Sequence, residues 1–365
     1  MSRGLLAATL LAITAGAARA DAAPPDEPRA AADVLPEAAP APSTARRLAA
    51  IGAAIVPGVV VRGAGSWVIG ERRTARRLLT TAAIGLGAMA IGGVAVGVSG
   101  ASDYTIIPGV PLVIVGAGLV LPTWFADIWV AAGGERVVAA PHALAPWSLE
   151  GGTTWLRDPY RDRALVRTAA RVQLGRLGLG AASLIDARGD AQTGELEARW
   201  RLLGAAATGQ AIPDGSSLVV RAATRIHRDD ADDVTLLTGE VEVIARVDLR
   251  RLERVLADTF VELSTGLGVE RATYARATHD TASLLLGRFA WGAYLGTRSE
   301  LAVFYDHRRD SLAGGFPAWR ASGFFGSFGA TAELRIAGPW AVLAELEVGN
   351  AWVSTLAVRY HGGTP

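Results

Sequence analysis

The chain has 365 residues, of which 50% are hydrophobic and 19% charged, and its formal net charge at pH 7 is +1. Nothing in this near-neutral balance points to a nucleic-acid or acidic partner, and no nucleic-acid partner is predicted. The chain contains no cysteine, which excludes disulfides and thiolate metal sites and suits export through an oxidising compartment.

The first twenty residues, MSRGLLAATLLAITAGAARA, have the three parts of a secretory signal peptide. Arg3 supplies the basic start, an apolar run follows, and residues 18–20 form a small-residue cleavage site. The run is short for a membrane span, so residues 1–20 are predicted to be cleaved rather than kept as an anchor. Residues 21–44 are rich in Ala and Pro, hold little apolar surface, and are predicted to form a disordered tether.

Residues 45–135 contain two long apolar runs and are predicted to form an α-helical hairpin in or against a membrane. The run 78–99 carries no charge, residues 100–104 form a short polar loop, and the second run starts at residue 106. Each run is long enough to cross a bilayer as a helix. Several glycines, Gly85, Gly87, Gly92, Gly93 and Gly97, are expected to let the two helices approach closely. The alternative, two buried helices of a soluble domain, would need unusually long core helices.

Two groups of side chains flank this hairpin where a membrane interface is expected. A basic cluster precedes the first run and is predicted to be a juxtamembrane anchor, with contact to lipid phosphates as the alternative. It consists of Arg72, Arg73, Arg76 and Arg77. Near the end of the second run, Trp124 and Trp129 fit an interfacial aromatic belt.

From about Thr153 onward the hydrophobic period becomes two, which is typical of strands with one apolar and one polar face. In GELEARWRLLG, residues 194–204, charged side chains occupy the odd positions from 195 to 201 and apolar side chains the even ones. The pattern recurs to the end of the chain. It predicts about twelve strands, with ten possible, in residues 147–365, and the polar tracts between them are predicted loops.

Alternation alone does not separate a soluble β-sandwich or barrel from a membrane barrel. The apolar face consists of small and medium side chains, which lipid accepts but which fill a dry core poorly. Aromatic residues gather toward strand ends, as in the girdles of membrane barrels. These are Trp155, Trp319, Phe324, Phe325, Phe328, Trp340, Trp352 and Tyr360. Both observations favour a membrane barrel.

The polar face carries both signs of charge in the same strands. These side chains are predicted to point into a barrel lumen, where opposite charges on neighbouring strands can pair. The predicted lumenal charge network comprises Arg167, Arg171, Glu195, Glu197, Arg199, Arg201, Arg221, Arg225, Glu240, Glu242, Arg246, Glu262, Arg288, Glu333, Arg335, Glu345 and Glu347. Because an open sheet edge is intolerable in lipid, the sheet must close.

On these patterns, residues 147–365 resemble the outer-membrane β-barrel class of Gram-negative bacteria. The resemblance implies a closed antiparallel transmembrane β-barrel in the outer membrane. It also implies membrane lipid and the outer-membrane insertion machinery as partners. The class often ends in an aromatic residue, whereas Tyr360 lies five residues before the end of this chain.

Few residues are candidates for catalysis. No two of the five histidines have metal-ligand spacing, and neither a metal nor a cofactor is predicted. His279 and Ser283 are four residues apart in loop-like sequence, a spacing that does not fit the patterns of outer-membrane enzymes. Asp306 and His307 are adjacent, so they point in opposite directions if they lie in a strand.

Three functions are open from the sequence. The preferred one is a non-enzymatic outer-membrane barrel, structural or a narrow channel, with the helical hairpin appended. Mixed lumenal charge argues against strong ion selectivity, and paired charges can plug a small barrel. The second is an inner-membrane-anchored protein with a periplasmic β domain that binds a partner, because a hydrophobic hairpin tends to be retained there. The third is a barrel enzyme acting on lipid or peptide.

Overall fold

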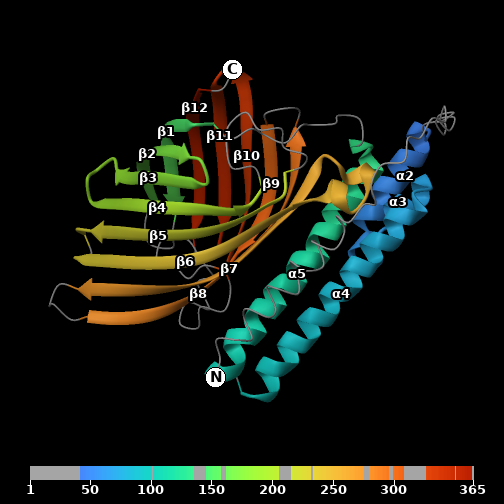
Figure 1. Ribbon diagram of the computed structural model, residues 1–365, viewed down its shortest axis with the longest axis horizontal. Coiled ribbons are helices and arrows are strands. Elements are labelled where there is room, and N and C mark those ends of the chain that lie inside the picture. Colours follow the sequence, from blue (N-terminus) through green and yellow to red (C-terminus); the bar gives the residue numbers. More distant parts are fainter. Residues whose placement is uncertain are drawn as a thin grey trace.

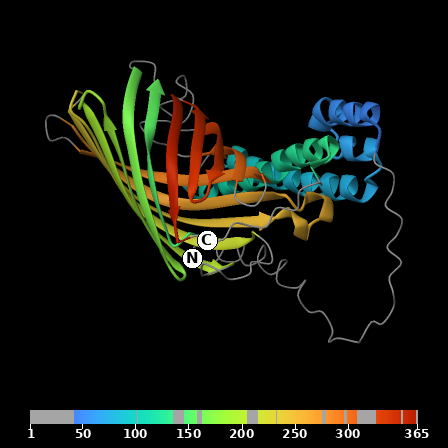
Figure 2. The same ribbon diagram turned by 90° about the horizontal axis from the view of Figure 1, so that it is seen from above.

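The computed structural model describes residues 42–100, 102–134, 145–157, 162–204, 215–231, 233–274, 279–295, 299–307, 326–349 and 351–363. The predicted signal peptide and nearly all of the predicted tether lie outside these residues. The described part consists of an N-terminal helical unit and a closed antiparallel β-barrel of twelve strands (Figures 1 and 2). The predicted fold class, with twelve rather than ten strands, is confirmed.

The helical unit contains more than the predicted hairpin. Its elements are α2 (Thr44–Ile55), the 3₁₀ helix η1 (Pro57–Val59), α3 (Ala64–Ile69), α4 (Arg72–Val98) and α5 (Asp103–Ala132). The two long helices, α4 and α5, form the antiparallel hairpin, and α2 and α3 pack at its base (Figure 1). Gly63 precedes α3 and Gly70 ends it, with φ of 86° and 101°, a left-handed conformation that glycine adopts at little cost.

The hairpin helices touch through backbone at two glycine positions. A Cβ added to Gly85 would lie 2.7 Å from the carbonyl oxygen of Gly116, and one added to Gly92 would lie 2.6 Å from that of Gly109. Such close approach is typical of helix packing in membranes. The other predicted packing glycines lie on the opposite side, because a Cβ on Gly87, Gly93 or Gly97 would meet nothing within 4 Å.

The barrel follows the chain in simple up-and-down order. Its strands are β1 (Trp147–Arg157), β2 (Asp162–Leu174), β3 (Leu177–Asp186), β4 (Ala191–Leu203), β5 (Ser217–Asp229), β6 (Val234–Asp248), β7 (Thr259–Tyr274), β8 (His279–Leu295), β9 (Ser299–Asp306), β10 (Ser327–Ala337), β11 (Trp340–Val348) and β12 (Trp352–Gly362). Two 3₁₀ helices, η3 (Leu249–Arg251) and η4 (Arg254–Leu256), join β6 to β7. Antiparallel pairing of β1 with β12 closes the sheet. We call the end that holds the start of β1 and the finish of β12 the turn end, and the opposite end the loop end.

The outer surface of the barrel is apolar and the inner surface is charged. On β4, Leu196 is 62% exposed and Trp200 is 50% exposed, whereas the intervening side chain of Glu197 is only 8% exposed because it points into the lumen. The alternation predicted from GELEARWRLLG therefore has its apolar face outward. This is the reverse of a soluble barrel and the arrangement of a barrel in lipid.

Aromatic side chains mark both edges of the apolar surface. At the loop end, Trp155 on β1 and Trp352 on β12 are 50% and 59% exposed. At the turn end, the ring of Tyr360 lies 5.3 Å from that of Trp147 and 4.9 Å from that of Trp340, measured between centroids. These positions match interfacial girdles. Of the other predicted girdle residues, Phe328 is the second residue of β10 and lies beside Tyr305. Trp319, Phe324 and Phe325 lie outside the described residues.

The outward orientation of β4 can be tested at Leu196. Replacing it by Arg places a charge in hydrocarbon, so Leu196→Arg is expected to lower the free energy of unfolding by roughly 2–4 kcal/mol. Leu196→Met keeps the apolar character and should be nearly neutral. Urea unfolding in lipid vesicles measures both. Equal stability of the two variants would mean that position 196 faces water.

Candidate functional site: the barrel lumen

A single arginine organises the charges on one wall of the lumen. The guanidinium of Arg221 on β5 lies 2.6 Å from Glu195 and 3.0 Å from Glu197, both on β4. It also lies 3.2 Å from Glu240 and 3.6 Å from Glu242 on β6. The Arg221 side chain is only 7% exposed. Cross-strand register therefore builds a buried hub of one cation among four carboxylates.

Two further arginines donate hydrogen bonds to a carboxylate of this hub. Glu197 also accepts hydrogen bonds from Arg199, at 3.0 Å, and from Arg171 on β2, at 3.2 Å. Arg171 reaches across β3 because the inward positions of that strand include Gly180. A Cβ there would lie 2.8 Å from Cγ of Glu197. Thus a glycine on the intervening strand allows ion pairing between β2 and β4.

A second group of charges lines the seam that closes the barrel. Glu150 on β1 pairs with Arg167 on β2 at 2.5 Å and with Arg359 on β12 at 2.7 Å. Arg359 also contacts Glu333 on β10, which in turn lies 2.8 Å from Nε2 of His361. Glu150 and Arg359 were not predicted as lumenal. Both residues alternate with apolar neighbours, which was the available sequence signal, but the pair that they form with each other joins positions 209 residues apart.

A third group lies at the turn end. Arg246 on β6 pairs with Glu262 on β7 at 3.0 Å and with Glu300 on β9 at 2.9 Å, and it stacks over the ring of Phe260 at 4.1 Å. The bond to Glu300, another residue missed from the sequence, passes over β7 and β8. It therefore narrows this end of the lumen.

The remaining predicted network residues also lie on inward-facing positions. Arg288 stacks over the ring of Phe304 at 4.2 Å. The hydroxyl of Ser327 donates to Glu347, and Arg335 donates to the Gly338 carbonyl at 3.4 Å. Among the described residues, no ion pair joins Arg201 or Glu345 to an opposite charge.

A cavity of about 210 Å³ lies beside the hub carboxylates Glu195 and Glu197. Arg167, Arg171 and Arg225 line it from β2 and β5, and Glu345 and Glu347 line it from β11. Thr154 and Thr355 also line it and hydrogen-bond to each other at 2.9 Å, and apolar side chains such as Leu156 and Leu165 fill the rest of the wall. The cavity thus lies inside the barrel and has charged groups of both signs in a partly apolar wall.

The predicted membrane-interface residues lie at the base of the hairpin. Arg77 and Arg73 pair with Glu253, between η3 and η4, at 2.9 and 3.5 Å, while Arg72 and Arg76 are exposed. The two tryptophans differ from the expected aromatic belt, because both are half-buried against protein. The Nε1 atom of Trp124 donates to the Ala54 carbonyl at 2.8 Å, and Trp129 packs edge-on against Trp291.

The enzyme candidates do not form a site. His279 and Ser283 lie on β8, not in a loop as predicted, and their register positions face outward. Asp306 ends β9 facing the lumen, whereas Nδ1 of His307 lies 2.9 Å from the hydroxyl of Tyr305. In the described part of the chain, no group of three or more histidine or acidic side chains could hold a metal ion.

Removing the hub cation tests the arrangement of the lumen. Arg221→Met leaves four buried carboxylates without their shared counter-charge, so it should lower the free energy of unfolding by about 3–5 kcal/mol. Arg225→Met is the matched control, because Arg225 is more exposed than Arg221 and pairs with Glu195 at 3.1 Å. An equal loss in both variants would contradict the hub.

Comparison with known proteins finds only loose structural matches. No protein-family model matches the sequence, and no curated protein matches it. Among solved structures, the chain is similar to the KdgM porin, with 7% identity and a TM-score of 0.37, covering 58% of this chain and 98% of that one. It is also similar to the NanC porin, with 8% identity and a TM-score of 0.39, covering 58% of this chain and 98% of that one. Omp33 of Acinetobacter baumannii has 9% identity and a TM-score of 0.32, with 60% of this chain and 98% of that one covered.

These superpositions are loose, so the class of the barrel follows from its own construction. Twelve antiparallel strands close on themselves, the outer surface is apolar, and the charges point inward. No such inverted barrel is stable with its outer face in water. The chain therefore has the fold of the outer-membrane β-barrel class, in agreement with the predicted location, and it carries a helical hairpin on its outer wall.

Proposed function

We propose that this protein is a non-enzymatic outer-membrane pore of narrow bore for small hydrophilic solutes. One observation carries the proposal. The hub around Arg221 pairs with β4 and β6, its immediate neighbours, so these charges lie along the wall instead of crossing the lumen. A cavity of about 210 Å³, lined by charged side chains of both signs, lies beside them.

The charges around the cavity predict weak ion selectivity. Arg167, Arg171 and Arg225 are balanced by acidic side chains that include Glu345 and Glu347. A wall of this kind holds water and gives neither cations nor anions a strong advantage. Because Glu345 has no ion-pair partner among the described residues, it is the carboxylate whose removal should change the balance most directly.

A purely structural barrel is the second candidate function. The Arg246–Glu300 pair favours it, because that pair reaches from β6 to β9 and narrows the turn end. The periplasmic β domain is not proposed, since its apolar side chains would face water. A lipid- or peptide-cleaving function receives no support from the separated positions of His279, Ser283, Asp306 and His307.

Conductance in a planar phosphatidylcholine bilayer separates the two candidates. The full-length chain should give discrete current steps with a reversal potential near zero in a KCl gradient. The double variant Glu345→Gln with Glu347→Gln should move the reversal potential toward anion selectivity, because two lumenal negative charges are lost. Asp230→Asn is the control, since Asp230 pairs with outward-facing Arg228 in an exposed turn. Folded protein that inserts without current steps would show that the barrel is plugged.

A further inference from the structure

We propose that the α4–α5 hairpin is a second membrane-spanning element of the folded protein. In this arrangement α5 is permanently docked on the outer wall of β7 and β8, and the exposed face of α4 contacts the acyl chains of the bilayer that holds the barrel. The inference goes beyond the pore and requires only that the barrel lies in a membrane. Four observations carry it.

First, α5 and the barrel wall fit each other through reciprocal notches. A Cβ added to Gly287 on β8 would lie 2.6 Å from Cδ1 of Ile114, so the isoleucine fills the space of the missing side chain. A Cβ added to Gly118 on α5 would lie 2.4 Å from Cδ2 of Leu263 and 2.8 Å from Cβ of Phe289. In lipid there is no hydrophobic driving force between apolar surfaces, so their association depends on close packing. The interlocking glycines provide that packing and make the contact specific.

Second, the hairpin covers aromatic side chains that would otherwise face lipid. Trp291 occupies an outward position of β8 in register with Val261, yet it is only 7% exposed. Its ring stacks on Phe125 at 5.6 Å and meets Trp129 edge-on at 6.2 Å. Strand β8 is consequently buried on both faces near the turn end.

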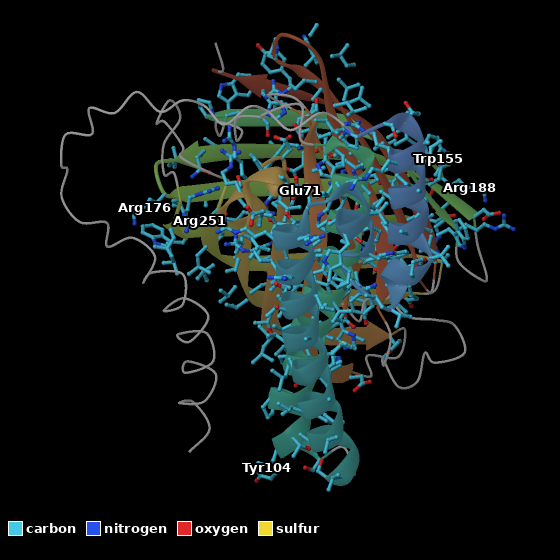
Figure 3. The ribbon with its side chains drawn as sticks, turned by 90° about the vertical axis from the view of Figure 1, so that its right-hand side faces the viewer. Glu71, Tyr104, Trp155, Arg176, Arg188 and Arg251 are labelled. Atoms are coloured by element: carbon cyan, nitrogen blue, oxygen red, sulfur yellow. The ribbon has the colours of Figure 1, made fainter. Side chains whose placement is uncertain are left out.

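Third, the base of the hairpin is fixed to the turn end of the barrel. Leu256 of η4 is fully buried in a cluster with Leu78 of α4 and with Ala126 and Val130 of α5. Within the helical unit, the buried carboxylate of Asp127 accepts hydrogen bonds from Ser66, at 2.8 Å from its amide and 2.6 Å from its hydroxyl. The hairpin tip must then point toward the loop end, and Tyr104, 91% exposed, lies far from Glu71 and Arg251 in Figure 3.

Fourth, the uncovered face of α4 has the chemistry of the barrel's lipid surface. Ile84, Ile91 and Val94 are each more than 60% exposed, and no charged residue occurs between Leu78 and Val98. The helix has 27 residues, which at ~1.5 Å per residue exceeds the ~30 Å of a hydrocarbon core. The apolar face of α4 continues the outer surface of the barrel, where Leu267 of β7 is 57% exposed. Because the two surfaces are continuous, the acyl chains that surround the barrel are expected to cover the exposed face of α4 as well.

Spin labels in the cysteine-free chain test this placement. Single variants Ile91→Cys, Leu267→Cys and Arg188→Cys are labelled in the full-length protein and reconstituted in phosphatidylcholine vesicles. Collision with oxygen, which concentrates in lipid, is compared with collision with a water-soluble nickel chelate. We expect Ile91 to match Leu267, with high oxygen and low nickel accessibility, and Arg188 in an exposed turn to show the reverse.

Two results would overturn the proposal. If Ile91 matches Arg188 while Leu267 remains in lipid, the barrel is in the membrane and α4 is in water. If Ile91 is shielded from both reagents while Leu267 is not, a protein covers α4. Nickel accessibility at Leu267 would remove the membrane assignment of the barrel itself, so the failures are distinguishable.

A glycine pair tests the permanent docking independently. Gly118→Leu fills the notch that receives Phe289, so the helical signal in circular dichroism should melt roughly 2–10 °C lower than in the unmodified chain. Gly87→Leu is the matched control, because the space around Gly87 is open, and it should melt as the unmodified chain does. Equal melting of the two variants would contradict interlocking at Gly118.

Discussion

The rest of the structure depends on the closure of the sheet by β1 and β12. In hydrocarbon, an unpaired backbone N–H or C=O group has no water to bond, so an open edge would cost several kcal/mol per group. The eleven residue pairs from Trp147–Gly362 to Arg157–Trp352 remove that edge. Once the sheet is closed, each strand has one face toward lipid and one toward an enclosed lumen, and the two-residue period sorts the side chains between them.

Closure also explains why the charged residues can be so numerous inside. Each lumenal charge is desolvated on one side, and opposite charges on neighbouring strands offset that cost. Arg221 does this for two carboxylates on each side of β5, and Glu150 does it for arginines on each side of β1. Because these pairs join adjacent strands, they run along the wall of the barrel.

On the outside of the barrel, the hairpin covers part of the wall. Where α5 covers β8, outward positions change from the exposed aliphatic side chains of a lipid surface to glycines and buried aromatic rings, as at Gly287 and Trp291. Barrel and hairpin then form one apolar exterior, with the arginines of α4 and Glu253 meeting at the turn end. This view makes the helical unit part of the membrane domain.

The fold could be predicted because it depends on local periodicity, which residues 194–204 display in a single strand. The direction of the apolar face was inferred from side-chain size and aromatic placement. Contacts that depend on strands distant in sequence were harder: Glu150, Glu300 and Arg359 were not predicted as lumenal. The docking of α5 on β8 had no local signal, because a packing glycine such as Gly118 and an open one such as Gly87 look alike in sequence.

The most direct test of the central claim, a closed barrel in the outer membrane, is heat modifiability on a detergent gel. Separated outer- and inner-membrane fractions would be run boiled and unboiled. A closed barrel resists detergent, so the account predicts a band in the outer fraction that migrates faster when it is not boiled. A band in the inner fraction whose mobility does not change on boiling would contradict both the location and the closure.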